Sequence, residues 1–183
     1  MRVIAGRLGG RRLQAPKGRV TRPTSDRVRE ALFSMLGDIE DAVVLDLFAG
    51  TGALGIEALS RGAAKAVFVE RDGSALGALE GNLAELGVDG EEAEIRRGDA
   101  FGVLRRARES KETYDLVFID PPYRQARDWE PELSAILPSL LSPDARVVLE
   151  SDRRAPMGLA LEIEQERRYG NTNITIHRQC PAS

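Results

Sequence analysis

The sequence is poor in the residues that most often build disulfides and metal sites. Its 183 residues include one cysteine, Cys180, and one histidine, His177. A single cysteine cannot form an intramolecular disulfide, which fits a reducing cytoplasm. One Cys and one His also cannot supply the ligands of a structural zinc site. We therefore expect no metal and a cytoplasmic location.

Long apolar runs are missing as well. No stretch approaches the roughly 20 apolar residues that cross a bilayer, and the opening MRVIAGRLGG lacks the apolar segment of a signal peptide. Hydrophobic residues nevertheless make up 42% of the chain. That share can fill the core of one ordinary domain. The sequence predicts a globular protein with no membrane partner.

Charge is distributed unevenly along the chain. The formal net charge is -3, yet residues 1–30 hold nine Lys and Arg against Asp26 and Glu30, a net of +7 that leaves -10 for the remainder. A basic terminus on an acidic protein suggests a polyanionic partner, although a merely solvated terminus fits the charge equally well. The nine cations are Arg2, Arg7, Arg11, Arg12, Lys17, Arg19, Arg22, Arg27 and Arg29.

Hydrophobic periodicity predicts strands that alternate with helices. Residues 2–5 and 11–15 read as a small hairpin, and a helix begins after Thr24 or Ser25 and stops at Gly37. Alternation of this kind is typical of a doubly wound parallel sheet, and the two final strands turn at Gly170-Asn171 to add an antiparallel edge. Further strands are expected at 42–48, 65–70, 92–98, 114–120, 145–151, 159–169 and 173–179, and further helices at 53–62, 74–87, 100–110 and 128–138.

A glycine-rich loop follows the first buried strand and opens a helix. In LDLFAGTGALG, Gly50, Gly52 and Gly55 match G-x-G-x-x-G, and Glu70 ends the next strand. Glycines let the backbone turn tightly and let a ligand approach closely, and the acid can accept hydrogen bonds from ribose hydroxyls. The sequence therefore predicts a nucleotide-like ligand at this loop.

Two ligands compete for that loop, a dinucleotide and an adenosyl-amino-acid such as S-adenosylmethionine. Asp46, four residues before Gly50, would repel a pyrophosphate but suits a cationic amine and sulfonium. Asp99 follows the third strand, where it can accept from an adenine amine, cap the next helix, or do both. The acids favour the adenosyl-amino-acid.

The fourth strand ends in DPPY, which is Asp120, Pro121, Pro122 and Tyr123. A carboxylate and the Pro121 carbonyl offer two acceptors at fixed positions for the two hydrogens of a planar exocyclic amine. Such a grip favours a pyramidal nitrogen whose lone pair can point at a methyl group, while the tyrosine ring can stack on a base. These residues predict methyl transfer to an amine.

These motifs together resemble a known family. DLFAGTGALG, Glu70, GDA at residues 98–100 and DPPY look like the class I S-adenosylmethionine-dependent methyltransferases that methylate amines. RVIAGRLGGRRL and RPTSDRVREALFSML narrow the likeness to the bacterial RsmD-type enzymes, which methylate N2 of one guanine in 16S ribosomal RNA. The resemblance covers nearly the whole chain. It implies an α/β Rossmann-like fold whose mostly parallel seven-stranded sheet has an antiparallel last strand, with a small N-terminal β-hairpin.

The resemblance also implies roles for individual residues. S-adenosylmethionine would be the methyl donor and S-adenosylhomocysteine the product, with no metal. Asp120, Pro121, Pro122 and Tyr123 would hold the guanine. Cofactor contacts would come from Asp46, Phe48, Gly50, Gly52, Glu70, Arg71, Asp99 and Ala100.

The resemblance gives the basic terminus a partner. Residues 1–24 would form a hairpin and linker for RNA, ahead of a methyltransferase domain at 25–183. The expected substrate is 16S RNA within a small ribosomal subunit or an assembly intermediate, and the enzyme is expected to be a monomer. The phosphates would be held by Arg7, Arg11, Arg12, Arg22 and Arg27.

Rival functions remain at this point. DPPY alone does not name the base, so a DNA adenine-N6 or cytosine-N4 methyltransferase is an alternative. An NAD-dependent oxidoreductase and a non-catalytic RNA-binding protein are further rivals of other classes. Trp129 is expected to pack on the core rather than to stack on a base, and His177 to be a partly exposed strand residue rather than a catalyst.

Overall fold

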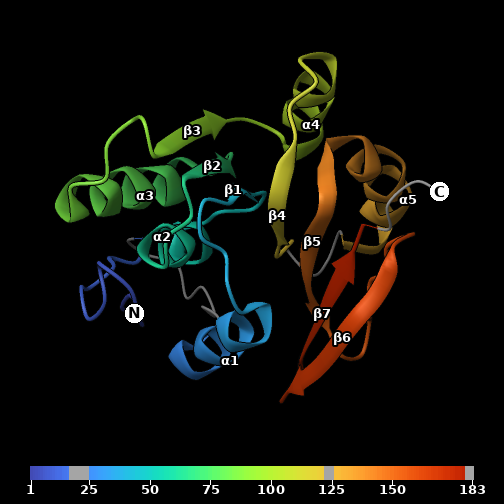
Figure 1. Cartoon of the computed structure of the whole chain (residues 1–183), viewed down its shortest axis with the longest axis horizontal. Helices are drawn as coiled ribbons and strands as arrows, with labels where there is room; N and C mark the ends of the chain where they lie inside the picture. The colour runs from blue at the N-terminus through green and yellow to red at the C-terminus, as the bar shows by residue number, and fades with distance from the viewer. Residues whose placement is uncertain (17–24, 122–125, 180–183) are drawn as a thin grey trace.

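The computed structural model describes residues 1–16, 25–121 and 126–179, and strands alternate with helices through most of this length (Figure 1). Within these ranges no helix is long and apolar enough to cross a membrane. The elements are α1 (Asp26–Leu36), β1 (Val43–Asp46), α2 (Ala53–Ser60), β2 (Lys65–Glu70), α3 (Gly73–Leu86), β3 (Ala93–Arg97), α4 (Ala100–Glu109), β4 (Tyr114–Ile119), α5 (Ala126–Ile136), the 3-10 helix η1 (Leu137–Leu140), β5 (Leu141–Asp152), β6 (Glu162–Tyr169) and β7 (Thr172–Arg178).

One seven-stranded sheet organises the molecule, in the order β3-β2-β1-β4-β5-β7-β6. β1 to β5 pair in parallel, whereas β7 is antiparallel to both β5 and β6. The predicted α/β fold with an antiparallel last strand is therefore confirmed. Because parallel strands end at one edge of a sheet, the residues that follow β1, β2, β4 and β5 come together there.

Local signals in the sequence set several helix boundaries. The Ser25 Oγ accepts from the Val28 N–H (3.4 Å) at the start of α1, and the Asp99 carboxylate accepts from the Gly102 N–H (3.0 Å) at the start of α4. α1 ends at Gly37, whose φ of 65° favours glycine. Of the two predicted N-caps, Ser25 takes this role and Thr24 lies outside the described residues. The predicted stop at Gly37 is confirmed.

The segments 2–5 and 11–15, predicted as a small hairpin, do lie antiparallel, but they do not extend into two full strands. The segment forms a tight loop with one antiparallel bridge, Arg2 to Arg12, and Gly6 and Gly10 take positive φ within it. Within this arm, residues 1–16, the Val3 N–H donates to the Arg11 carbonyl (2.9 Å) and the Leu13 N–H to the Met1 carbonyl (3.0 Å). The Ile4 and Ala5 N–H groups donate to the Glu57 carboxylate of α2 (2.7 and 3.1 Å), so the arm bonds to a helix as well as to itself.

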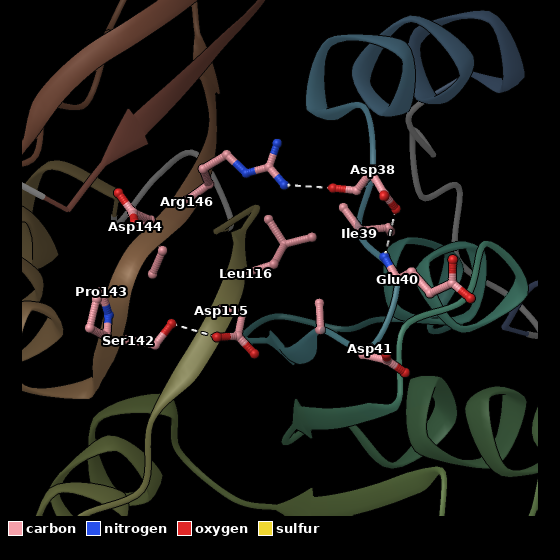
Figure 2. A pocket seen from close by; sticks show the side chains of 12 residues that line it. Asp38, Ile39, Glu40, Asp41, Asp115, Leu116, Ser142, Pro143, Asp144 and Arg146 are labelled. Atoms are coloured by element: carbon pink, nitrogen blue, oxygen red, sulfur yellow. Dashed lines mark hydrogen bonds between the residues drawn. The ribbon is translucent and has the colours of Figure 1, made fainter.

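The amino-terminal edge of the sheet carries a small pocket of about 220 Å³ (Figure 2). Its lining is rich in acids, and Arg146 is held there by the Asp38 carbonyl (3.1 Å) and the Leu36 carbonyl. Ser142 donates to the Asp115 carboxylate (2.5 Å). These residues precede or begin β1, β4 and β5, so the pocket lies at the edge opposite the glycine loop.

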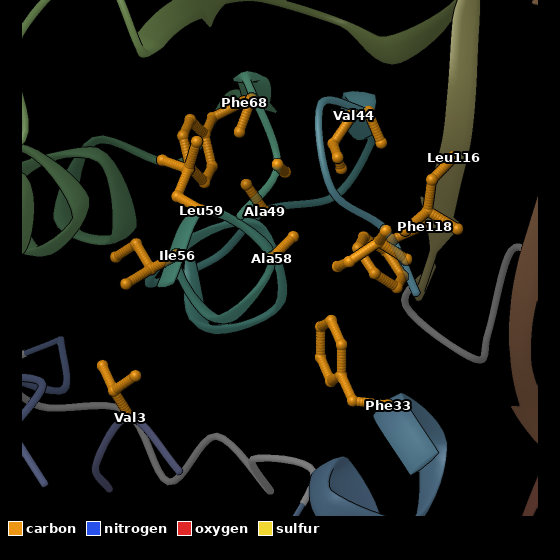
Figure 3. Packing of buried hydrophobic residues seen from close by; sticks show 14 of the residues in the cluster. Val3, Phe33, Val44, Ala49, Ile56, Ala58, Leu59, Phe68, Leu116 and Phe118 are labelled. Atoms are coloured by element: carbon orange, nitrogen blue, oxygen red, sulfur yellow. The ribbon is translucent and has the colours of Figure 1, made fainter. Parts of the chain in front are cut away.

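The sheet separates two apolar clusters. α1, α2, α3 and the N-terminal arm cover one face, and Figure 3 shows Phe33 of α1 beside Phe118 of β4 and Val3 of the arm facing α2. The Phe33 and Phe118 ring centroids lie 5.7 Å apart. α4, α5 and η1 cover the other face, where Val117 and Ile119 point. The alternation within β4 follows the two-residue period of a strand.

Candidate functional site

Four carboxylates lie at the carboxyl-terminal edge of the parallel strands. Asp46 ends β1 and pairs in register with Phe68 and Phe118. Glu70 lies two residues beyond Phe68 and Asp120 two beyond Phe118, so all three project to the same face of the sheet. Glu150 of β5 follows Leu149, the register partner of Ile119, and therefore neighbours Asp120. The topology gathers acids that are far apart in the sequence.

The glycine loop needs its glycines for two different reasons. Gly50 and Gly52 have φ of 56° and 79°, in the left-handed region. A Cβ on Gly52 would lie 2.4 Å from Leu79 Cδ1, whereas one on Gly50 would have no atom within 4 Å. Gly52 thus fits tightly against α3, and Gly50 presents an open backbone surface that a ligand can approach. The loop was predicted correctly, including its strand–loop–helix context.

The Glu70 carboxylate accepts hydrogen bonds from the backbone of this loop and of the turn after β2. Its Oε2 accepts from the Gly50 N–H (2.8 Å), and its Oε1 accepts from the N–H groups of Arg71 (2.7 Å) and Asp72 (2.8 Å). A carboxylate has about four acceptor positions, so it retains capacity for a further donor. Glu70 therefore holds the shape of the loop, and its contact with a ribose stays a prediction.

Burial dominates the chemistry of Asp46. Its side chain accepts from the Gly55 N–H (3.0 Å) and is 3% exposed. Burial and the negative charge of Glu70 raise the pKa of Asp46 to about 7, against the lowering effect of the Gly55 hydrogen bond. A bound cation would favour the ionised form and return the pKa toward its usual range.

The pKa of Asp120 is shifted by the same surroundings. Burial, followed by the charges of Glu150 and Asp46, raises its pKa well above the ordinary aspartate value. Glu150 itself is 8% exposed. Sequence analysis missed Glu150, and the only signal was an acid within the apolar run VVLES. Pro121 is buried beside Asp120, while Pro122 and Tyr123 lie outside the described residues.

The remaining predicted cofactor residues surround this edge. Asp99 is the N-cap of α4 and Ala100 its first residue, so the capping role is confirmed and the adenine contact stays a prediction. Arg71 is exposed, directly after β2. Phe48 is half-buried and stacks on Trp129, with ring centroids 5.2 Å apart and planes 2° apart. Trp129 also meets Phe101 edge-on at 5.7 Å, as expected of a packing residue.

The arm's arginines lie on the surface, and two of them also contact the body of the protein. Arg7 pairs with Glu92 (2.6 Å), and Arg11 donates to the Glu85 carbonyl (2.7 Å). Arg12 and Arg27 are exposed. Arg22 lies outside the described residues. The structure therefore places four of the five predicted RNA contacts on the surface and leaves their role a prediction.

The expectation for His177 was wrong in one respect. The ring is 1% exposed, close to the Thr175 Oγ1 (2.9 Å) and the Leu161 carbonyl (3.3 Å). Burial lowers its pKa, although the Leu161 contact opposes this. The reason is the strand order: β7 lies between β5 and β6, so its residues are interior where an edge strand would expose them.

Comparisons with known proteins find relatives that cover most or all of this chain. A family model described as conserved hypothetical protein 95 matches residues 1–178. The ribosomal RNA small subunit methyltransferase D of Haemophilus influenzae is 36% identical over 86% of this chain and 81% of its own length. A solved Escherichia coli structure, provisionally named a methyltransferase, is 34% identical with a TM-score of 0.85, covering 100% of this chain and 99% of that one.

A more distant structure shares the fold. An RNA methyltransferase from Salinibacter ruber in complex with S-adenosyl-L-homocysteine has a TM-score of 0.66 over 88% of this chain and 95% of that one. At 23% sequence identity, this likeness shows a shared fold.

Proposed function

This chain belongs to the RsmD-type methyltransferase family, and from that membership we propose that it methylates the exocyclic N2 amine of a guanine in small-subunit ribosomal RNA. It is an S-adenosylmethionine-dependent rRNA methyltransferase. Two parts of the proposal are more specific: guanine N2 as the methylated atom, and an assembled particle as the substrate. They rest on the site's chemistry and on the likeness of the motifs.

One observation carries the proposal: Asp46 and Asp120 lie beside the glycine loop, close enough for the charge of Asp46 to raise the pKa of Asp120. Two carboxylates so placed disfavour a pyrophosphate, which would add negative charge to them. They suit a ligand with an amine and a sulfonium. S-adenosylmethionine supplies an electrophilic methyl group next to those charges.

The residues present fit that ligand. The open backbone face of Gly50 allows close approach, and Asp46 would hold the cationic amine. Glu70 has acceptor capacity for the ribose, and Asp99 and Ala100 begin the helix beside the expected adenine. Phe48 and Arg71 border the same edge.

Asp120 and the Pro121 carbonyl would grip the two hydrogens of the guanine amine. Such binding would direct the nitrogen lone pair at the methyl carbon of S-adenosylmethionine, so that the N–C bond would form as the S–C bond breaks, with S-adenosylhomocysteine as the product. The methylated nitrogen would be acidic, and its proton would pass to the Asp120 carboxylate or to water. Pro122 and Tyr123 would fix the base, as the motif suggests.

The basic arm would hold the RNA. In this proposal residues 1–24 contact phosphates through Arg7, Arg11, Arg12 and Arg22, with Arg27 at the start of the catalytic region 25–183. We propose a monomer that acts on the small subunit or its assembly intermediate, in the cytoplasm where that particle forms.

The test uses labelled S-adenosylmethionine, small ribosomal subunits from cells lacking the enzyme, and the wild-type or Asp120→Ala protein. Nuclease digestion and mass spectrometry should find N2-methylguanosine with the wild type and at least about a hundredfold less with the variant. Label in adenosine or cytidine, or equal label from both proteins, would overturn the proposal. Duplex DNA in a parallel reaction tests the amino-methyltransferase alternative.

A further inference from the structure

Asn82 of α3 joins two parts of the molecule to which the proposed function gives separate tasks. Its side chain is fully buried, at 0% exposure. The Nδ2 group donates to the Thr51 carbonyl (3.0 Å) in the glycine loop and to the Gln14 carbonyl (3.2 Å) in the N-terminal arm. The Oδ1 atom accepts from the Gln14 N–H (2.7 Å). One amide therefore bonds to the loop and to the arm at once.

The bond to Thr51 lies at the start of α2, whose N-cap is Gly52. Gly55 is in the first turn, where N–H groups have no partner within the helix, and its N–H donates to the Asp46 carboxylate. The Thr51 carbonyl precedes the N-cap and accepts from Asn82. Asp46 and Asn82 therefore bond to the backbone on either side of Gly52.

The same helix face supports the loop by packing. Leu79, three residues before Asn82, approaches Gly52 so closely that a Cβ there would lie 2.4 Å from its Cδ1. Residues three apart lie on one side of a helix. Leu79 and Asn82 therefore contact adjacent residues of the loop, one by shape and one by hydrogen bonding.

The arm also bonds to α3 at Glu85, three residues beyond Asn82. Arg11 donates to the Glu85 carbonyl (2.7 Å), and the Gln14 side chain donates to the Glu85 carboxylate (3.0 Å). Figure 1 shows the N-terminal segment beside α2 and α3. A buried amide among apolar residues is costly unless its groups are bonded, and here the bonds cross between three segments.

We propose that Asn82 is a positioning residue, which holds the glycine loop in its cofactor-binding shape and fastens that loop to the arm that meets RNA. The inference rests on the proposed function for the identity of the ligand. Loss of the amide donor leaves the Thr51 carbonyl without the Asn82 hydrogen bond, so the loop that joins Asp46 to α2 loses a constraint on its shape. The arm then contributes to cofactor affinity even before RNA is bound.

The test measures S-adenosylmethionine binding by calorimetry, without RNA, for Asn82→Asp and Leu83→Ala. The aspartate has nearly the same shape but turns an acceptor toward two carbonyls. We expect Asn82→Asp to raise Kd about tenfold, as expected for the loss of about one hydrogen bond. Leu83 is a buried core residue of the same helix, so Leu83→Ala controls for lost stability and should keep the wild-type Kd.

Steady-state kinetics distinguish a positioning role of Asn82 from a catalytic one. With saturating S-adenosylmethionine, Asn82→Asp should retain most of kcat while KM for the cofactor rises. An unchanged Kd for Asn82→Asp, or an equal loss in Leu83→Ala at matched melting temperature, would overturn the inference. A wild-type protein that does not bind S-adenosylmethionine would overturn the proposed function instead.

The link to the arm is tested at one position. Gln14→Pro removes the N–H that donates to Asn82, whereas Gln14→Ala keeps it and loses only the side-chain bond to Glu85. We expect weaker cofactor binding from the proline variant and wild-type binding from the alanine variant, with circular dichroism confirming that both are folded. Wild-type affinity in Gln14→Pro would remove the arm from the proposal.

Discussion

Asp46 and Asp120 show most directly what the site is prepared to bind. Each is an acid whose pKa is raised by burial and by a neighbouring carboxylate. A ligand that brings positive charge relieves both effects, because it favours the ionised forms. Binding of a sulfonium ligand should therefore release protons near neutral pH.

The stability of Asp46→Asn should depend on pH in a defined direction. In the folded protein the pKa of Asp46 is about 7, compared with an ordinary 3.8. Between these two pH values the folded state keeps the Asp46 proton that the unfolded state has released. The stability that this proton gives the folded state is fully present below pH 4 and is lost as the pH rises through 7. Asparagine does not titrate, so the variant should gain on the wild type from pH 5 to pH 8, by at most about 3 kcal/mol.

Thermal unfolding without cofactor at several pH values checks this expectation. Glu109→Gln, which changes an exposed acid of α4, is the control and should show no such trend. A difference between Asp46→Asn and wild type that stays constant from pH 5 to pH 8 would contradict it.

Glu150 should control the pH at which Asp120 becomes active. Among the described residues, Glu150 and Asp46 are the charges that raise the pKa of Asp120, and Glu150→Gln removes the first without changing its shape. The pKa of Asp120 should fall, so the acidic limb of kcat/KM should move to lower pH by about one unit. A pH–rate profile on small subunits measures the shift, and an unmoved limb or one at higher pH would refute the role.

The sequence predicts some of these residues and conceals others for a physical reason. Asp46, Glu70 and Asp120 each stand where an apolar strand ends, and parallel strands end together, so their meeting could be predicted. Glu150 lies inside a strand, and Asn82 lies inside a helix. Their roles depend on strand register and on the docking of the arm, which no local pattern specifies.

At the scale of elements, the N-terminal arm departs most from the prediction made for it. Its peptide groups bond to α2: the Arg7 N–H donates to the Ser60 carbonyl (2.8 Å), and the Leu8 N–H to the Ser60 Oγ (3.0 Å). Val3, Leu8 and Leu13 join the core beside α2 and α3. The alternation of apolar residues suggested strands, but the tertiary contacts of the arm decided its conformation.

Gly6 and Gly10 offer a matched pair to test that docking. Both have positive φ, 79° and 82°. A Cβ at Gly6 would lie 1.7 Å from the Ser60 carbonyl oxygen, whereas a Cβ at Gly10 would have open space. Gly10→Ala should lower the free energy of unfolding by about 1 kcal/mol of backbone strain, and Gly6→Ala by at least about twice that because the arm must move.

Hydrogen exchange at the Val3 and Leu13 amides should distinguish the two variants. These groups donate to the Arg11 and Met1 carbonyls within the arm. Faster exchange in Gly6→Ala than in Gly10→Ala would support docking through α2. Equal protection in both would show that the arm tolerates the displacement.

At the scale of the whole molecule, the proposed function gives the separation of charge a role in RNA binding. A net of +7 over residues 1–30 stands against -10 elsewhere, so we expect the basic segment to attract phosphates that the acidic remainder repels. Such a field would orient the encounter and make it depend on salt. Docking of the arm against α2 and α3 would then present the RNA to the edge of the sheet where Asp120 lies.

Removing one positive charge from the arm should reduce the salt dependence of RNA binding by about the share of one phosphate contact. Arg12 is exposed on the arm, and if it neutralises one phosphate, Arg12→Gln should reduce the slope of log K against log salt by about 0.7 to 0.9. Arg105→Gln is the matched control, because Arg105 is exposed on α4 and pairs with Glu132 (2.5 Å). Filter binding of a 16S RNA fragment at 50 to 200 mM salt measures the slope for both variants.

An equal fall of the slope in the two variants would contradict a specific role of the arm. Both variants lose one positive charge, but only Arg12 lies on the arm, so equal slopes would mean that RNA binding depends on net charge alone.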